Sequence, residues 1–188
     1  VDKIRGIFRF KNATGSCNNC IINNCLIENI GSYGLFATAE AKGTWIFNNV
    51  VLTNSTINES GIDLLQKGPL LKTQQDQSIS FEINQCTIYG LAYAIINSGN
   101  KPLTLNISNT LFGGFQSGQA VKGYEDGTTV NSSENVYTVS DSPFQSNALG
   151  ECLTITGADL FNAPATTDGD FTVKIDTYKT YGDQRWNK

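Results

Sequence analysis

Apolar and polar residues repeat in four similar stretches of the chain, at residues 19–29, 44–54, 80–90 and 104–114. Each stretch has apolar residues alternating with others, then an Asn or Gln, a small residue, a second apolar pair, and a polar residue or Gly. Aligned on Asn24, Asn49, Gln85 and Asn109, the stretches follow at steps of 25, 36 and 24 residues (49 − 24, 85 − 49, 109 − 85). Periods of this length indicate stacked units, and they predict an all-β fold: a single-stranded right-handed parallel β-helix.

The same alignment predicts which side chains stack in the interior. One expected apolar stack contains Ile27, Leu52, Ile88 and Phe112, and a second contains Ile22, Phe47, Ile83 and Ile107. The four matched amides are expected to form a hydrogen-bonded ladder between coils, because a buried amide without partners is costly. We therefore interpret these amides as structural rather than catalytic.

The coils are expected to span residues 1–158, and residues 159–188 are expected to form an extended tail that packs on the helix. An uncovered final strand is a sticky edge, so the tail would pack on the last coils or cover the open end. Trp186 is the expected anchor. Segments that interrupt the repeat are predicted loops, where repeat proteins often place binding surfaces. They are residues 66–77, 122–133 and 141–150.

The charge balance of the chain restricts its partners. The 188 residues carry a formal net charge of −4, which argues against nucleic acid as a partner. Four basic residues near the start, Lys3, Arg5, Arg9 and Lys11, are interpreted as a solvated strand face or an exposed first coil. No apolar run is long enough to cross a bilayer. We expect a monomer, and Val1 without a signal-peptide pattern suggests a mature product or a fragment of a longer protein.

The five cysteines do not form a recognisable metal or redox motif. Cys17 and Cys20 make a CxxC, but the chain contains no His, and the βαβ context of a redox CxxC is absent. Cys25 and Cys86 occupy the same repeat position with Val50 between them. Two strand spacings of about 4.8 Å separate them by nearly 10 Å, which is too far for a disulfide. Most of the cysteines are expected to be small packing residues.

The tail carries three short motifs: DLF at residues 159–161, GDFTV at 169–173 and GDQRW at 182–186, with Pro164 between the first two. Together with the repeats, this ending resembles that of pectate-lyase-like right-handed β-helix proteins from Bacteroidetes. Gln184 stands where that family usually has Pro. The resemblance implies polysaccharide-related biology, a secreted or cell-surface location (outer-membrane associated in a Gram-negative bacterium) and further coils before Val1.

A catalytic site is difficult to assemble from this sequence. A polysaccharide lyase needs a base and a Ca²⁺ ion or basic group that stabilises the developing enolate. Acidic residues do not recur in register in the repeats, and the best pair is Asp63 with Lys67, equally interpretable as a surface acid and a loop lysine. No metal site or cofactor is predicted, and Ca²⁺ enters only if the protein is a lyase.

Carbohydrate binding needs less, namely exposed aromatic rings beside amides and charges. The candidates are Trp45, Tyr89, Tyr93 and Tyr124. Trp45 fits the core equally well, whereas Tyr89 shares its repeat position with Glu28, Thr53 and Gly113, which suggests exposure. Our leading hypothesis is a polysaccharide-binding domain without catalysis in this segment. One alternative is a lyase whose site is shared with upstream coils, and another is a structural stalk or adhesin.

Overall fold

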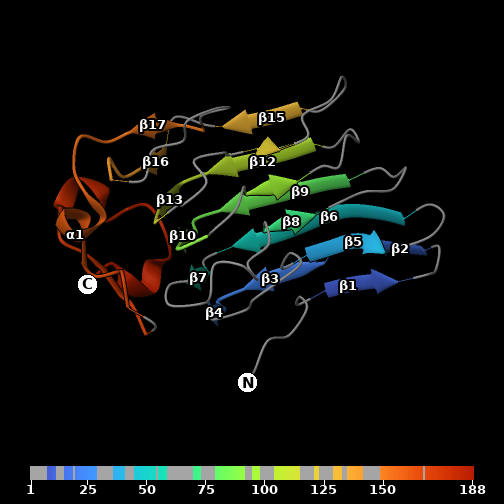
Figure 1. The fold of residues 1–188 in the computed structure, drawn as a ribbon, viewed down its shortest axis with the longest axis horizontal. Coiled ribbons are helices and arrows are strands. Elements are labelled where there is room, and N and C mark those ends of the chain that lie inside the picture. The colour runs from blue at the N-terminus through green and yellow to red at the C-terminus, as the bar shows by residue number, and fades with distance from the viewer. Residues whose placement is uncertain are drawn as a thin grey trace.

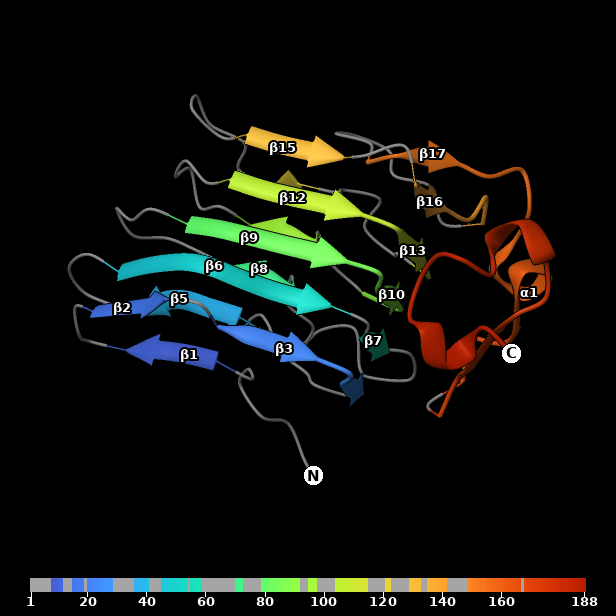
Figure 2. The same ribbon diagram turned by 180° about the vertical axis from the view of Figure 1, so that it is seen from behind.

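The protein is mostly β-structure with very little helix. The computed structural model describes residues 8–11, 15–18, 20–28, 36–40, 45–53, 55–58, 70–72, 79–91, 95–97, 104–114, 121–122, 129–132, 135–141, 149–166 and 168–188. Three sheets contain only parallel strand pairs, and one short antiparallel pair lies in the C-terminal region (Figures 1 and 2). The expected all-β class is therefore confirmed.

The three parallel sheets are named here A, B and C. Sheet A contains β1 (Phe8–Lys11), β5 (Phe36–Glu40), β8 (Leu71–Lys72), β11 (Ile96–Asn97) and β14 (Val121–Lys122). Sheet B contains β2 (Gly15–Asn18), β3 (Ile21–Asn23), β6 (Trp45–Thr53), β9 (Ile79–Asn84), β12 (Thr104–Ser108) and β15 (Thr129–Ser132). Sheet C contains β4 (Leu26–Glu28), β7 (Thr56–Asn58), β10 (Thr87–Tyr89), β13 (Thr110–Gly113), β16 (Val136–Thr138) and β17 (Glu151–Cys152).

The chain visits these sheets in a fixed cycle. From β4 to β16 it passes from C to A to B and back to C, and each visit adds a strand beside the one before. Two segments expected to be loops contribute strands to this cycle, because β8 lies within residues 66–77 and β15 begins within residues 122–133.

Three of the four matched amides lie at the bend between sheets B and C. Asn24, Gln85 and Asn109 have φ angles of 56°, 55° and 47°, in the left-handed region. Asn is one of the few residues other than Gly that adopts this conformation at low cost, because its short polar side chain can hydrogen-bond locally. The repeated amide therefore marks a repeated backbone conformation.

The fourth matched amide was misaligned. Asn49 lies inside β6, where Thr53 pairs with both Asn23 and Asn84, so Asn49 does not occupy the position that follows those two residues. The register of β6 against β9 shifts between Phe47 and Val50, where three steps along β6 face two steps along β9, so β6 contains one extra residue. The segment WIFNNVVLTN contains two polar pairs, Asn48-Asn49 and Thr53-Asn54. Matching Asn49 to the amides of the other stretches was therefore wrong.

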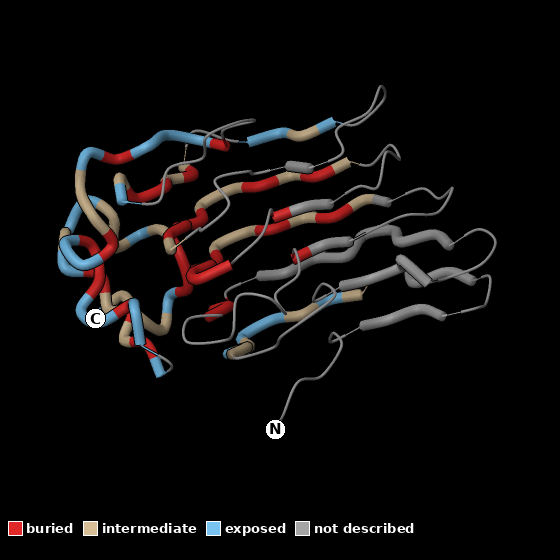
Figure 3. Tube along the Cα trace, in the orientation of Figure 1, coloured by how far each residue is buried: buried red, intermediate tan, exposed pale blue. Residues whose placement is uncertain are grey.

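The corrected register changes both predicted apolar stacks. Backbone pairing places Ile22, Leu52, Ile83 and Ile107 in one column and Ile27, Ile57, Ile88 and Phe112 in the other. Leu52 was expected beside Ile27 and Ile88, but it belongs to the column of Ile22 and Ile83. Phe47 was expected in that column and instead pairs with Ile79. Ile57, Ile83, Ile88 and Phe112 are fully buried. Figure 3 shows the buried segments in red along the sheets.

Two of the matched amides, Gln85 and Asn109, make hydrogen bonds outside the expected ladder. Asn109 Nδ2 donates to Asn84 Oδ1 at 3.1 Å, and Ser108 Oγ donates to the same oxygen at 3.0 Å. Gln85 Nε2 instead donates to the carbonyl of Thr180 at 3.2 Å. Gln85 thus binds the C-terminal tail rather than the matched amide of the next strand.

The tail lies alongside sheet C, on the face turned away from the main core (Figure 1). It begins with the short helix α1 (Gly157–Leu160) and the antiparallel pair β18 (Phe161–Ala163) and β19 (Asp170–Val173). Two single-turn helices follow, η2 (Asp176–Tyr178) and η3 (Gln184–Trp186). Trp186 Nε1 donates to Thr56 Oγ1 of β7 at 2.7 Å, so this anchor binds an early strand and not the last one.

The left-handed bend can be tested at Asn109. We expect Asn109→Val to lower the free energy of unfolding by about 1–2 kcal/mol more than Asn109→Gly, because a β-branched residue is strained at positive φ. Both variants lose the amide bond to Asn84, so their difference isolates the backbone cost. Equilibrium urea unfolding measures it, and equal stabilities would contradict the assigned conformation.

Candidate functional site

The predicted site residues are only partly covered by the structure. Asp63, Lys67, Tyr93 and Tyr124 lie outside the described residues. Trp45 begins β6 in sheet B, but its side chain is also outside the description. Tyr89 is the one candidate whose side chain lies within the described part of the chain.

The expected exposure of Tyr89 is wrong. Its side chain is 6% exposed, and its ring lies against Phe161 and Phe171 of the tail, with centroid distances of 6.2 and 5.5 Å. Burial, with a smaller contribution from the nearby Asp141 carboxylate, raises the pKa of Tyr89 to about 12. A ring in this position cannot serve as a platform for sugar, so Tyr89 is a core residue between sheet C and the tail.

Glycines make the space that the Tyr89 ring occupies. A Cβ atom on Gly113, in the next strand, would lie 2.5 Å from Tyr89 Cε2, and one on Gly157 would lie 2.6 Å from the Tyr89 hydroxyl. Gly113 at the matching repeat position suggested solvent exposure, but its missing side chain accommodates the neighbouring ring. The Gly-Asp motifs of the tail, at residues 169–170 and 182–183, did not reveal which strand the tail would cover.

A buried carboxylate fastens the tail to sheet C. Asp183 is 1% exposed and accepts a 2.7 Å hydrogen bond from Thr56 Oγ1, while its backbone N–H donates to Thr87 Oγ1 at 3.1 Å. Arg185 Nε lies 2.8 Å from Oδ2, the same carboxylate oxygen that accepts from Thr56, and the backbone N–H of Arg185 donates to Oδ1 at 3.1 Å. We call Thr56, Thr87, Asp183, Arg185 and Trp186 the tail clasp. The hydrogen bonds and the ion pair of the tail clasp join its residues to one another, so we assign it a structural role.

The described cysteines form no disulfide and no metal cluster. Cys86 is buried, Cys20 and Cys25 are half-buried, and Cys152 is exposed. Cys25 and Cys86 are thiols separated by Ser55, not Val50, which confirms that this pair does not bridge. Burial raises the pKa of the Cys86 thiol to about 12. Within the described ranges, no group of three or more Cys, Asp or Glu side chains could hold a metal ion.

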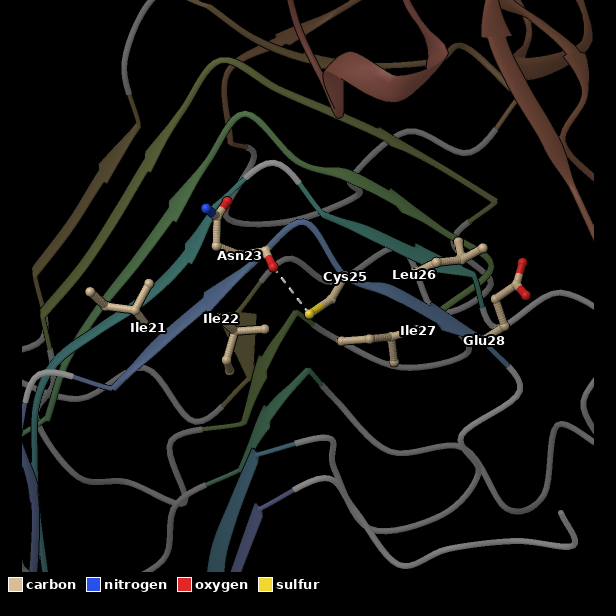
Figure 4. Close-up of a pocket in the computed structure, with 7 residues that line it drawn as sticks. All are labelled: Ile21, Ile22, Asn23, Cys25, Leu26, Ile27 and Glu28. Carbon is tan, nitrogen blue, oxygen red and sulfur yellow. Dashed lines mark hydrogen bonds between the residues drawn. The ribbon is translucent and has the colours of Figure 1, made fainter.

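A hollow of about 650 Å³ lies beside the bend between β3 and β4 (Figure 4). Ile22, Cys25 and Ile27 point to one side of the bend, and Ile21, Asn23, Leu26 and Glu28 point to the other. Ile21 and Leu26 are 69% and 46% exposed. The lining is mostly aliphatic, which gives few donors or acceptors for a hydroxyl-rich ligand.

Sheet A carries a column of basic residues that the sequence did not reveal. Backbone pairing places Arg9 opposite Ala37, Ala37 opposite Lys72, Lys72 opposite Asn97, and Asn97 opposite Lys122. Cations therefore occupy every second strand of the sheet. Arg9 had been grouped with its neighbours Lys3, Arg5 and Lys11, and Lys72 with a loop. Only the register of strands far apart in the sequence aligns them.

Sheet B presents a polar hollow of about 390 Å³ lined by Glu82, Asn106, Ile107, Ser108, Asn131 and Ser132. Glu82, Asn106 and Asn131 pair across β9, β12 and β15 and form one register column. Asn131 Nδ2 donates to Asn106 Oδ1 at 2.8 Å, so two amides of this column are hydrogen-bonded to each other across β12 and β15.

No family model, curated protein or solved structure matches this chain. The described part of the chain also contains no helix that is long and apolar enough to span a membrane. The class that the fold and these faces define is a mostly-β protein with three parallel sheets, two of which carry polar or charged columns. The Bacteroidetes resemblance of the tail remains an expectation.

The tail clasp predicts a specific stability loss. Asp183→Ala should lower the free energy of unfolding by about 3 kcal/mol, because it leaves Thr56 and the half-buried Arg185 without their acceptor. Asp183→Asn keeps the shape and should lose less. Asp176→Ala removes an exposed ion pair with Lys179 and is the control, with no measurable loss expected. Urea unfolding followed by tryptophan fluorescence would report each change, and an unchanged Asp183→Ala midpoint would contradict the clasp.

The raised pKa of Tyr89 predicts a loss of stability at alkaline pH. An unfolded tyrosine ionises near pH 10, whereas folded Tyr89 keeps its proton to about pH 12, so the unfolded state loses a proton first. Stability should therefore fall from pH 10 to pH 12, by up to about 1.4 kcal/mol per pH unit from this group. Tyr89→Phe removes that contribution while Cys86 retains its own. Urea unfolding at a series of pH values measures the free energy of unfolding of the wild type and of Tyr89→Phe. If this free energy falls equally with pH in both proteins, Tyr89 is solvated and the prediction is wrong.

Proposed function

We propose that this chain is a right-handed parallel β-helix that binds an anionic polysaccharide along sheet A, without catalysis in this segment. The cyclic order of strands through three parallel sheets supports the helix. Its hand is supported by the strong preference of parallel crossover connections for the right-handed form, at about 98%.

The observation that carries the binding function is the register column of Arg9, Lys72 and Lys122. Strands in a sheet lie about 4.8 Å apart, so these cations recur about every 10 Å across the sheet. In an extended polyuronate, carboxylates on one side of the chain recur at every second sugar. A polyanion lying across the strands would therefore meet a cation at each such carboxylate.

A column of basic residues is notable in a chain that carries a net negative charge. The protein has a formal net charge of −4, so basic residues are not simply abundant. Burying three unpaired cations would be very costly, and we expect the column to lie on the solvent side of sheet A. Its charge density is too low for duplex DNA, which carries a phosphate about every 1.7 Å of its axis. A sparsely charged polymer is the better match.

The tail resemblance supports the same function and adds a location. A family associated with polysaccharides and with secreted, surface-associated proteins from Bacteroidetes is consistent with a glycan ligand outside the cell. We propose a secreted or cell-surface location on this ground.

Polyuronate lysis is a second candidate because the same column offers a base. Arg and Lys serve as bases in β-helix lyases, and Arg9, Lys72 or Lys122 could take this role. Incubation with polygalacturonate and alginate, with and without Ca²⁺, tests it through absorbance of unsaturated products near 235 nm. We expect no product from this chain, and product formation that stops in Lys72→Gln would favour the lyase.

Affinity electrophoresis tests binding directly. Native gels containing polygalacturonate or alginate should retard the protein relative to gels without polymer. Lys72→Gln with Lys122→Gln should weaken binding about tenfold, or about 1.4 kcal/mol, and reduce its dependence on salt. Lys174→Gln with Lys179→Gln is the matched control, because it makes the same change in net charge on the tail. Equal weakening by both pairs would mean that only net charge matters, which contradicts the column.

A further inference from the structure

The described faces of the protein differ sharply in charge. The strands of sheet B have the sequences GSCN, IIN, WIFNNVVLT, ISFEIN, TLNIS and TVNS. Among them Glu82 is the only charged residue, and no strand of the sheet contains Lys or Arg. A polyanion would find no cation here and would be repelled by Glu82, so this face cannot share the ligand of sheet A.

We propose that the outer face of sheet B is a second binding site, which takes a linear polysaccharide without negative charge. The polymer would lie across β9, β12 and β15, along the column of Glu82, Asn106 and Asn131. This site does not depend on sheet A, and it goes beyond the function proposed above.

Two polar residues of this face, Glu82 and Asn106, are flanked by core residues. Along β12 the residues alternate between half-buried and buried, and the inward residues Leu105 and Ile107 are 0% and 2% exposed. On the neighbouring strand, Phe81 and Ile83 flank Glu82 and are fully buried. Buried residues on both sides of Glu82 and Asn106 hold the backbone there, so little conformational entropy is lost at these two residues when a ligand binds.

Hydrogen bonds also fix the amides relative to one another. Asn131 Nδ2 is committed to Asn106 Oδ1, which leaves the Asn106 Nδ2 group as a donor and the Asn131 Oδ1 atom as an acceptor. Ser108 and Asn109 both donate to Asn84 Oδ1, at 3.0 and 3.1 Å. The hollow of about 390 Å³ thus presents a carboxylate acceptor beside oriented amides. Hydroxyl groups, which both donate and accept, satisfy such a mixed lining.

The spacing and the end of the column fit a sugar polymer. Neighbouring strands are about 4.8 Å apart, comparable to the advance of one pyranose ring along an extended chain. The register column continues from Glu82 through Val51 to Ile21, whose side chain is 69% exposed. An exposed aliphatic group in line with polar ones can contact the C–H face of a sugar ring. The exposure of Ile21 then has a binding role.

Isothermal titration calorimetry with uncharged polysaccharides tests the site. The probes are xyloglucan, galactomannan, mixed-linkage β-glucan and dextran, titrated into the whole chain. We expect at least one to bind, and Asn106→Ala with Asn131→Ala to weaken that binding about tenfold or more. Asn131 is exposed and Asn106 half-buried, so the fold should be retained, which circular dichroism checks. Asn162→Ala, an exposed tail amide, should leave binding unchanged. If no probe binds, or if the double variant binds like wild type, the site is disproved.

A charge comparison identifies the role of Glu82. The bound neutral polymer and its carboxymethylated form are compared in the Lys72→Gln, Lys122→Gln background, where sheet A contributes little. The neutral form should bind about tenfold better, and Glu82→Gln should reduce that ratio towards one. No preference in the parent variant would overturn the proposed selectivity. Loss of polyuronate binding in the lysine variants, with neutral binding retained, would separate this site from that of sheet A.

Discussion

The parallel register of backbone hydrogen bonds is the constraint on which the rest of the structure depends. It brings residues that are 14 to 35 positions apart directly opposite one another, from Tyr137 with Glu151 to Phe36 with Leu71. Apolar residues in register form the two interior stacks, and polar residues in register form columns on the outer faces. A slip of one residue in a strand would exchange these faces, because successive side chains point to opposite sides. The buried stacks therefore also fix the composition of each exposed column.

The sequence predicted the class of fold because its strongest signal is local and repeated. Alternating apolar residues, followed by an amide that tolerates positive φ, recur at Asn24, Gln85 and Asn109. The same pattern failed at Asn49, which lies inside β6, where that strand contains one extra residue relative to β9. Register shifts of this kind are set by contacts with neighbouring strands, which a single stretch of sequence does not contain.

The faces were predicted less well than the interior. Tyr89 was expected to be exposed because Glu28, Thr53 and Gly113 share its repeat position, but its side chain is 6% exposed. The tail covers the side of sheet C on which Tyr89 lies, and no pattern in residues 159–188 specifies which strands it contacts. Likewise, Arg9, Lys72 and Lys122 are separated by more than 40 residues at each step, so only the folded register reveals the column. In such a protein, the residues that share an exposed column are therefore known only once the register between strands is known.

The tail clasp has a consequence for how the molecule reaches its final form. Thr56 and Asp183 are 127 positions apart, and Trp186 binds the same threonine across 130. Contacts this distant in the chain raise the contact order and close only after a large loss of loop entropy. Tyr89, Leu111 and Val139 would remain a wetted apolar patch until the tail docks. A late docking step leaves a partly folded species that is prone to self-association, and stabilising the clasp would shorten its lifetime.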